Sequence, residues 1–472
     1  MEQKSHIAIL PCPGMGHLIP LLELAKVFAD LHHNFHVTCI IPTIGSPSKA
    51  MATVLEALPT SIDHVFLPPV NSEDLHTLHP GFQMSRTITL SLPSLRDVLK
   101  SLVATTRLAA LVVDPFAIEA LEVAKEFGVS PYIFEAVSAT VLSLLLHMPK
   151  LDETVQGEFR ELPEPLKLPG WPIPIQGRDL IEPLQDRKSE WYKLFLSHLK
   201  LFRLAEGIMV NTFMDLEERT IKALEVLAGD ASPLIFPIGP ITQTGSSTNH
   251  VDESGCISWL DNQPSGSVLF VSFGSGGTLS FDQLTELALG LELSGQRFIW
   301  VVRSPNDGPA NAAYVSNQSH QDPLAFLPKG FVERIEGQGL VVPSWAPQPR
   351  ILSHGSTGGF LTHCGWNSTL ESIVSGIPLI AWPLFAEQRM NAVLLTEDLK
   401  VALRPKANEK GLIEREEIAK VIKDLMASEE GKKAQNRMKV LKIAAEKALT
   451  GDGSSKELCL NWRQSWLLTK AG

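Results

Sequence analysis

Cysteine is scarce in this chain: its 472 residues contain five, and no two form a C-x-x-C pair. An odd number of widely separated cysteines argues against a disulfide framework and against a zinc site, and it predicts a reducing compartment. The five are Cys12, Cys39, Cys256, Cys364 and Cys459.

Long apolar runs and an excess of basic residues are also missing. No run reaches the ~18 apolar residues that a membrane span needs. The N-terminus, "MEQKSHIAILPCPGMGHLIP", has no basic region followed by a long apolar core, so we expect no secretory signal. A formal net charge of −11 disfavours nucleic acid or an anionic membrane as the main partner. We predict a cytoplasmic, monomeric protein that binds no nucleic acid and spans no membrane.

Short apolar runs alternate with helical stretches along the whole sequence. Runs such as "FHVTCII" (35–41) and "RFIWVV" (297–302) lack polar alternation, which is typical of strands covered on both faces of a parallel sheet. We therefore predict an α/β fold with parallel sheets. The other predicted strands lie at 6–12, 110–114, 131–134, 207–211, 267–273, 340–343, 358–362 and 378–382.

The length predicts more than one domain, since 472 residues are too many for one hydrophobic core. The stretch 238–255 is rich in Gly, Ser, Thr and Pro and has no periodicity, as a linker would. A second polar stretch, 304–323, is predicted to be a surface loop. The predicted parts are a domain at 1–240, a linker at 241–255, a domain at 256–455 and a terminal helix at 456–472.

Polar side chains follow several predicted strands of the second half. "THCGWNSTLESIVSG" passes from a strand into a helix whose first turn would offer backbone N–H groups to an anion, together with His363 and Ser368. Ser368 and Glu371 also have the spacing of a capping box, which is a purely structural alternative. The Gly-rich turn after "VLFVSF", containing Ser275, is a second place where backbone could approach a phosphate. Two such turns suit a diphosphate.

A nucleotide at these turns would need a base platform and groups that hold its sugars. Trp345 could stack on a base or plug the core. Glu371 could accept two ribose hydroxyls, and Glu387 with Gln388 could bind a second sugar. Alternatively, the Glu387–Gln388 pair is a helix N-terminal acid with a solvated neighbour.

In the first half, "PCPGMGHLIPLLELAKVF" predicts a strand, a glycine turn and a helix in which Pro20 lies in the first turn. His17 stands at the carboxyl end of that strand, and Asp114 ends the apolar run "AALVVD". A carboxylate after a buried strand needs a partner, so we predict a His17–Asp114 pair. Asp114 would fix the tautomer of His17, whose other nitrogen could act as a general base. A structural or solvated histidine is the alternative.

The 44 residues from Trp345 to Gln388 closely resemble the signature box of plant UDP-sugar glycosyltransferases of small molecules, and the resemblance extends over nearly the whole chain. It implies two facing Rossmann-like domains of the GT-B fold and inversion at the anomeric carbon. The terminal helix would pack on the first domain, and Gln388 would favour UDP-glucose. The donor-site residues that the resemblance implies are Ser275, Trp345, Ala346, Gln348, His363, Trp366, Asn367, Ser368, Glu371, Glu387 and Gln388.

The resemblance also places His17 and Asp114 as the catalytic dyad. It is strongest to the hydroquinone (arbutin-type) branch, within which an indoxyl glucosyltransferase is a further possibility. We therefore expect the product to be the β-O-glucoside of a small aromatic acceptor of the phenol or indoxyl type. The acceptor-pocket candidates are Met15, Phe116, Glu135, Leu142 and Leu145; Glu135 could equally point to solvent.

No Asp-x-Asp motif occurs in the sequence, so we predict a transferase that needs no metal and no cofactor beyond UDP-glucose as co-substrate. A dehydrogenase is disfavoured because "GSGGTL" and "GMGHLI" do not complete G-x-G-x-x-G. A serine hydrolase would need G-x-S-x-G, which is absent. A nucleotide-sugar epimerase and a non-catalytic UDP-sugar-binding protein remain open, and acceptor-dependent product formation would separate them from a transferase.

Overall fold

The computed structural model describes residues 5–30, 35–71, 73, 75, 78–228, 233–243, 254–308, 322–450 and 453–455. The chain divides into two compact units. Unit 1 comprises residues 1–174, 183–243 and 448–472, and unit 2 comprises residues 175–182 and 244–447.

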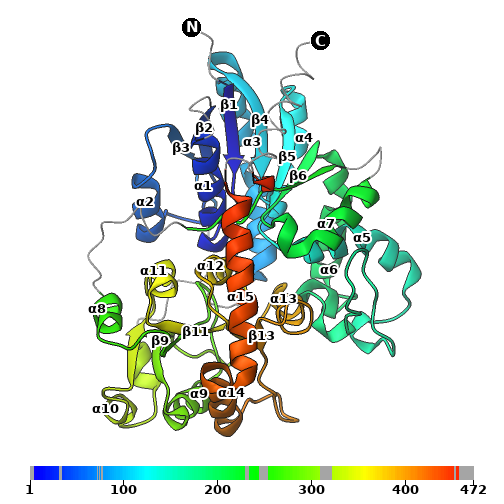
Figure 1. Ribbon diagram of the computed structural model, residues 1–472. Coiled ribbons are helices and arrows are strands. Elements are labelled where there is room, and N and C mark those ends of the chain that lie inside the picture. Colours follow the sequence, from blue (N-terminus) through cyan, green and yellow to red (C-terminus); the bar gives the residue numbers. More distant parts are fainter. Residues whose placement is uncertain are drawn as a thin grey trace. The chain divides into compact units, whose positions relative to one another are not determined.

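Within its described residues, unit 1 is built on a seven-stranded parallel sheet in the order β3-β2-β1-β4-β5-β6-β7 (Figure 1). The chain order reverses at β1, which lies between β2 and β4. This is the topological switch point, where the loops after β1 and β4 diverge to opposite sides of the sheet. The strands are β1 (Ser5–Leu10), β2 (Phe35–Ile41), β3 (Ile62–Phe66), β4 (Arg107–Val113), β5 (Ser130–Glu135), β6 (Gly207–Val210) and β7 (Leu234–Pro237).

Helices connect these strands as crossovers. The first of them, α1, buries Leu18, Leu22, Ala25 and Ala29, the face predicted to contact the sheet. It begins at Met15, so the prediction that Pro20 lies in the first turn was wrong; Pro20 lies inside the helix. The helices of unit 1 are α1 (Met15–Asp30), α2 (Lys49–Glu56), α3 (Pro80–Thr105), α4 (Ala120–Glu126), α5 (Ala139–Thr154), α6 (Glu190–Leu201) and α7 (Met214–Ala228).

Unit 2 repeats this architecture with a six-stranded parallel sheet in the order β10-β9-β8-β11-β12-β13, as far as its described residues show. The strands are β8 (Val268–Ser272), β9 (Arg297–Val302), β10 (Gly339–Pro343), β11 (Thr357–Thr362), β12 (Leu379–Ala381) and β13 (Ala402–Leu403). The helices are α8 (Cys256–Asp261), α9 (Phe281–Ser294), α10 (Phe331–Arg334), α11 (Gln348–Ser353), α12 (Trp366–Ser375), α13 (Gln388–Val393), α14 (Arg415–Ala427) and α15 (Glu429–Ala448). The switch point of this sheet lies between β8 and β11.

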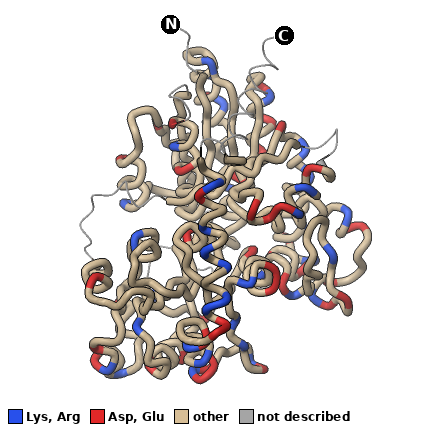
Figure 2. The backbone as a smooth tube through the Cα atoms, viewed as in Figure 1, with Lys and Arg blue, Asp and Glu red and all other residues tan. Residues whose placement is uncertain are grey.

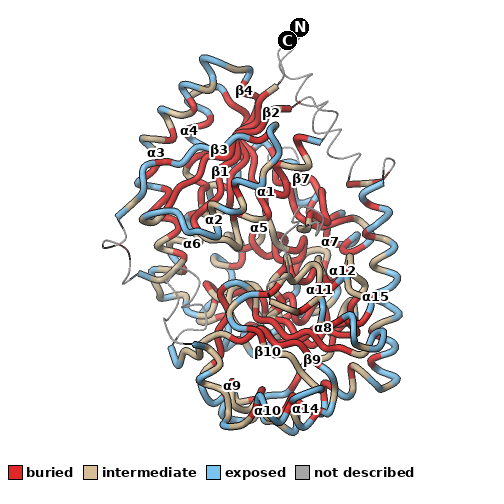
Figure 3. The backbone as a smooth tube through the Cα atoms, turned by 90° about the vertical axis from the view of Figure 1, so that its left-hand side faces the viewer, coloured by how far each residue is buried: buried red, intermediate tan, exposed pale blue. Residues whose placement is uncertain are grey.

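Each unit has its own hydrophobic core, and the central strands are buried along almost their whole length (Figure 3). In unit 1, Ile7 and Ile9 of β1 pack against Leu21 and Phe28 of α1. In unit 2, Leu269 and Val271 of β8 belong to the cluster that contains Leu287 of α9 and Ile418 of α14. Charged residues lie mostly on the helices and loops, as α15 illustrates (Figure 2). Among the described helices, none is both long enough and apolar enough to cross a membrane.

The predicted α/β class with parallel sheets is confirmed, and each of the ten predicted strands coincides with an observed one within a few residues. The sequence analysis missed β3, β7 and β13, which are edge strands of their sheets. The predicted domain limits stay a prediction, because residues 244–253 of the linker and the terminal stretch 456–472 lie outside the described residues. Residues 309–321 of the predicted surface loop also lie outside them.

Candidate active site

In unit 1, His17 and Asp114 are positioned at the switch point of the sheet. Asp114 directly follows β4, while His17 lies in the first turn of α1, after the turn that follows β1. Gly14 of that turn has φ of 119°, a conformation open to glycine but strained for most other residues. The backbone N–H of His17 donates to the carbonyl of Gly14, which fixes the start of the helix and the direction of the imidazole.

The predicted His–Asp pair is present. His17 Nδ1 lies 2.8 Å from Asp114 Oδ2, and the second carboxylate oxygen, Oδ1, accepts from the backbone N–H of Phe116 at 2.9 Å. Asp114 is buried, whereas the side chain of His17 is 23% exposed. A buried carboxylate that faces a ring nitrogen requires a proton between them, so Nδ1 carries the hydrogen and Nε2 is left with a lone pair.

An aromatic cluster adjoins the imidazole. The ring of Phe116 meets His17 edge to face, with centroids 5.4 Å apart, and is parallel to the indole of Trp191 with an interplanar angle of 2°. Phe82 and Phe195 contact the same indole. Only Phe116 of this cluster was predicted; Trp191 was missed because it lies in α6, far along the chain from His17 and from any predicted strand end.

The other acceptor candidates are less accessible than expected. Leu142 is completely buried and Leu145 nearly so, because both lie on the inner face of α5 and belong to the core. Glu135 ends β5 and is 2% exposed, so the alternative that it points to solvent was wrong. Met15 is partly buried and packs against the core of unit 1.

In unit 2, His363 follows β11 and is enclosed by two glycine turns. A Cβ atom at Gly274 would lie 2.6 Å from Nε2 of His363, and one at Gly365 would lie 2.5 Å from the same atom. Gly274 also has a positive φ of 72°, so both space and backbone conformation require glycine there. Burial, assisted by the charge of Arg303, lowers the pKa of His363 to about 4, and the ring is therefore neutral near pH 7.

Arg303 was not predicted as a site residue. It directly follows β9, its Nε is buried without a hydrogen-bond partner, and burial lowers the pKa of its guanidinium. Arg303 lies at the carboxyl edge of a parallel sheet, and its charge acts on the neutral ring of His363. An arginine in this position is suited to bind an anion. Its place directly after the run "RFIWVV" was the signal that could have found it.

Gln348, at the start of α11, connects two predicted site residues of α12. Its Nε2 donates to Ser368 Oγ at 2.9 Å and to Glu371 Oε2 at 2.7 Å. The capping-box alternative for Ser368 and Glu371 was wrong: α12 begins at Trp366 with Gly365 as its N-cap, so Ser368 is already inside the first turn. Both side chains instead accept hydrogen bonds from Gln348.

Trp345 is 68% exposed, so the alternative of a core tryptophan was wrong. It follows Ser344, whose φ of 64° turns the chain sharply after β10. The indole of Trp366, by contrast, is almost completely buried, as is Ala346. Asn367, in the first turn of α12, is only partly buried.

Glu387 and Gln388 lie where β12 leads into α13. Gln388 is buried, and its Oε1 accepts from the backbone N–H groups of Leu384 and Phe385 at 2.9 and 3.0 Å. Glu387 Oε1 accepts from Asn391 Nδ2 at 3.2 Å. The alternative of a solvated Gln388 was therefore wrong. Ser275, after β8, is exposed.

Two Rossmann-like units, each with polar residues at the carboxyl edge of its parallel sheet, are the architecture of GT-B glycosyltransferases. Residues 232–449 match the family model described as "UDP-glucoronosyl and UDP-glucosyl transferase". The chain is 59% identical to a hydroquinone glucosyltransferase of Rauvolfia serpentina, over 98% of each sequence. It is 56% identical to UDP-glycosyltransferase 72B1 of Arabidopsis thaliana, over 98% of this chain and 97% of the relative.

Solved structures agree. UGT2 of Phytolacca americana, complexed with UDP-2-fluoro-glucose and pterostilbene, is 51% identical with a TM-score of 0.90, over 98% of this chain and 99% of that one. A UDP-glucosyltransferase of Polygonum tinctorium capable of glucosylating indoxyl, complexed with 3,4-dichloroaniline, is 49% identical with a TM-score of 0.91, over 99% of both chains. The chain belongs to the UDP-glycosyltransferase family, and the predicted GT-B fold is confirmed.

Proposed function

We propose that this enzyme transfers glucose from UDP-glucose to the hydroxyl of a small aromatic acceptor of the phenol or indoxyl type, with inversion to a β-O-glucoside. The observation that carries the proposal is the hydrogen bond of His17 Nδ1 to the buried Asp114, next to an aromatic cluster. The relatives' names, hydroquinone glucosyltransferase among them, and the aromatic ligands of the solved neighbours support the same acceptor class.

His17 is proposed as the general base. Its Nε2 takes the proton of the acceptor hydroxyl while that oxygen attacks the anomeric carbon, and the bond from that carbon to the UDP oxygen breaks. Asp114 accepts from Nδ1 throughout and stabilises the imidazolium that forms. A phenol is fairly acidic, so an imidazole is a strong enough base to take its proton.

Phe116 and Trp191 are proposed as the wall that holds the acceptor ring. Their parallel planes, beside His17, suit a flat aromatic molecule that stacks or packs edge to face. Glu135 and Met15 are proposed as further residues that bound the pocket.

The donor site is proposed to lie in unit 2. The exposed Trp345 would stack on uracil, and the backbone of Ala346 would read its edge. Glu371, held by Gln348, would accept the two ribose hydroxyls. Glu387 and Gln388, with the first turn at Trp366, would bind the glucose; the Gln388 oxygen is already occupied by backbone donors, so its Nε2 is the group that donates to a sugar hydroxyl.

The diphosphate would be bound by His363, Asn367, Ser368, Ser275 and the backbone N–H groups in the first turn of α12. We add Arg303, whose positive charge balances the departing UDP. Since fixed donors and a guanidinium supply this charge, we propose that turnover requires no metal ion.

The experiment is acceptor-dependent UDP release from UDP-glucose, with EDTA present, for hydroquinone, indoxyl and other small phenols. We expect turnover in the wild type and its collapse in His17→Ala. His36→Ala is the matched control, because His36 also bonds an aspartate, Asp63 at 2.6 Å, but does so at the amino ends of β2 and β3. It should keep wild-type activity.

Three outcomes would contradict the proposal. UDP release without acceptor would favour a hydrolase, and UDP-sugar binding without any UDP release would favour an epimerase or a binding protein. Equal activity of His17→Ala and the His36→Ala control would remove His17 as the base.

A further inference from the structure

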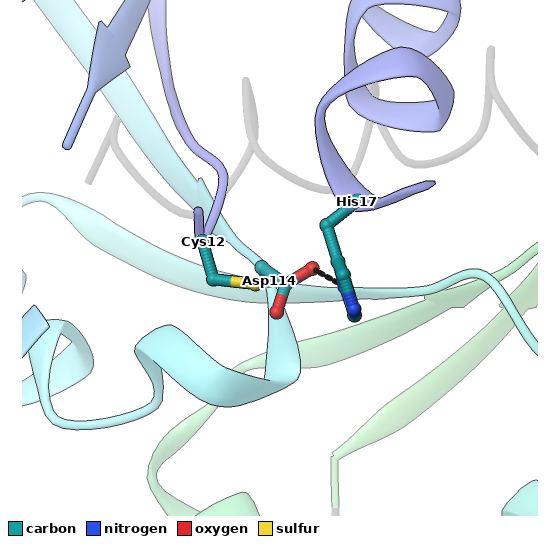
Figure 4. A group of neighbouring side chains, drawn as sticks. All are labelled: Cys12, His17 and Asp114. Atoms are coloured by element: carbon teal, nitrogen blue, oxygen red, sulfur yellow. Dashed lines mark hydrogen bonds and ion pairs between the residues drawn. The ribbon is translucent and has the colours of Figure 1, made fainter. Parts of the chain in front are cut away.

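A cysteine lies beside the His–Asp pair. Cys12 follows β1 and is buried, and the ligand atoms of Cys12, His17 and Asp114 all lie within 4.8 Å of one another (Figure 4). Among the described residues, this is the one group of three or more His, Cys, Asp or Glu side chains close enough to hold a metal ion. Cys12 has no part in the proposed transfer reaction.

A second sulfur adjoins the group. Met84 of α3 places its Sδ 3.5 Å from Cys12 Sγ. The cluster thus combines a thiol, a thioether, an imidazole nitrogen and a carboxylate, and the two sulfurs favour soft cations over Mg²⁺ or Ca²⁺.

We propose that Cys12, His17 and Asp114 form an inhibitory site for a thiophilic divalent cation such as Zn²⁺ or Cd²⁺. Zinc accepts all three ligand types at about 2.0 to 2.3 Å, which separates neighbouring ligand atoms by about 3.5 Å. Because the ligand atoms all lie within 4.8 Å of one another, their separations have to shrink by about 1 Å at most, which we expect side-chain rotation to supply. The partly exposed ring of His17 gives the ion its way in.

Charge favours the ion once it has entered. Asp114 is a buried carboxylate, and a thiolate at Cys12 would add a second negative charge that a divalent cation neutralises. Burial, and next the Asp114 carboxylate, raise the pKa of the Cys12 thiol, so without metal it stays protonated and the dyad works undisturbed. The cation replaces the thiol proton, and one proton leaves to solvent.

The ion also removes the base. A neutral imidazole bound to the metal through Nδ1 must carry its hydrogen on Nε2. Nε2 then has no lone pair with which to take the proton of the acceptor hydroxyl. The Asp114 oxygen that held the Nδ1 hydrogen becomes a metal ligand. Occupation of the site and general-base catalysis are therefore mutually exclusive.

Cd²⁺ is the probe for binding. Titration of the metal-free wild type should produce the ultraviolet thiolate-to-metal charge-transfer band, saturating at one ion per chain. Cys12→Ser keeps a polar atom of similar shape and should lose the band, while Cys256→Ser, which removes a buried thiol of unit 2, should keep it. A band that persists in Cys12→Ser, or no band in the wild type, would overturn the site.

Inhibition is measured separately, as activity at increasing free Zn²⁺ relative to each variant's own metal-free rate. We expect the Zn²⁺ concentration that gives half-inhibition to be about tenfold higher or more for Cys12→Ser than for the wild type or Cys256→Ser. Loss of a ligand weakens a metal site by at least that factor. Equal sensitivity of the three would overturn the inhibitory role. The inhibitory role rests on the proposed function of His17 as the base. Cd²⁺ bound at Cys12 without loss of activity would support the metal site and refute His17 as the base.

Discussion

Replacing Asp114 with asparagine should switch the tautomer of His17 without disturbing the fold. In the protein, Asp114 Oδ1 accepts from the Phe116 N–H and Oδ2 accepts from His17 Nδ1. An asparagine side chain has one acceptor and one donor group, and the Phe116 N–H requires the acceptor. Its NH₂ group would then face Nδ1, which must become an acceptor itself, and the ring hydrogen moves to Nε2.

The expected loss follows from that single proton. A histidine with hydrogen on Nε2 cannot accept a proton from the acceptor hydroxyl, so the whole contribution of general-base catalysis is lost, about 10²- to 10⁴-fold in kcat, or about 3 to 5 kcal/mol of barrier. Affinity for UDP-glucose should stay within a factor of about two, because the residues proposed to bind it all lie in unit 2.

Steady-state kinetics of UDP release, with a melting temperature for each variant, test this. Asp63→Asn is the matched control, since Asp63 bonds His36 at the amino ends of the strands. The reasoning would be refuted if Asp114→Asn kept more than about a tenth of wild-type kcat while folding normally. It would also be refuted if Asp63→Asn lost as much activity as Asp114→Asn.

Three further predictions concern unit 2. Trp345→Ala should raise KM for UDP-glucose about 5- to 100-fold through lost base stacking, while the melting temperature stays unchanged because the indole is exposed. Arg303→Gln should raise KM for UDP-glucose and the pKa of His363, measured by NMR titration, because a nearby positive charge is removed. Since the folded pKa of His363, about 4, lies below its usual 6.5, the unfolded chain takes up the proton first. The contribution of neutral His363 to the free energy of unfolding is thus complete above pH 6.5 and falls by at most about 3 kcal/mol toward pH 4. Urea unfolding at several pH values should show this loss, and the loss should be smaller in His363→Gln.

The strands that sequence could predict are those whose burial leaves a continuous apolar run. β1, β2, β8 and β9 lie inside their sheets, covered on both faces, and their runs contain few polar residues. β3 pairs on one side only, and four of its five residues are exposed, so its sequence "IDHVF" includes two polar residues and lacks a continuous apolar run. β13 has two residues and carries no periodic signal at all.

The same physics decides which site residues sequence could find. Asp114 and His363 directly follow apolar runs, and His17 follows another after a short glycine turn; the carboxyl edge of a parallel sheet is where such residues converge. The partnership of Gln348 with Glu371 could not be predicted, because it depends on how α11 packs beside α12. Trp191 lies in α6, a helix that follows a long irregular segment. No local sequence pattern predicts that this helix places Trp191 beside Phe116.

Asp114 explains why activity and metal sensitivity belong to one arrangement. Asp114 lies buried as the partner of His17, and its oxygens accept hydrogen bonds from His17 Nδ1 and from the Phe116 N–H. A carboxylate so placed attracts any cation that reaches it, and the buried thiol of Cys12 converts that attraction into preference for soft metals. Cys12→Ser would leave the hydrogen bonds of His17 and Asp114 intact and remove the soft ligand. This substitution should therefore make the enzyme resistant to zinc and leave the catalytic pair in place.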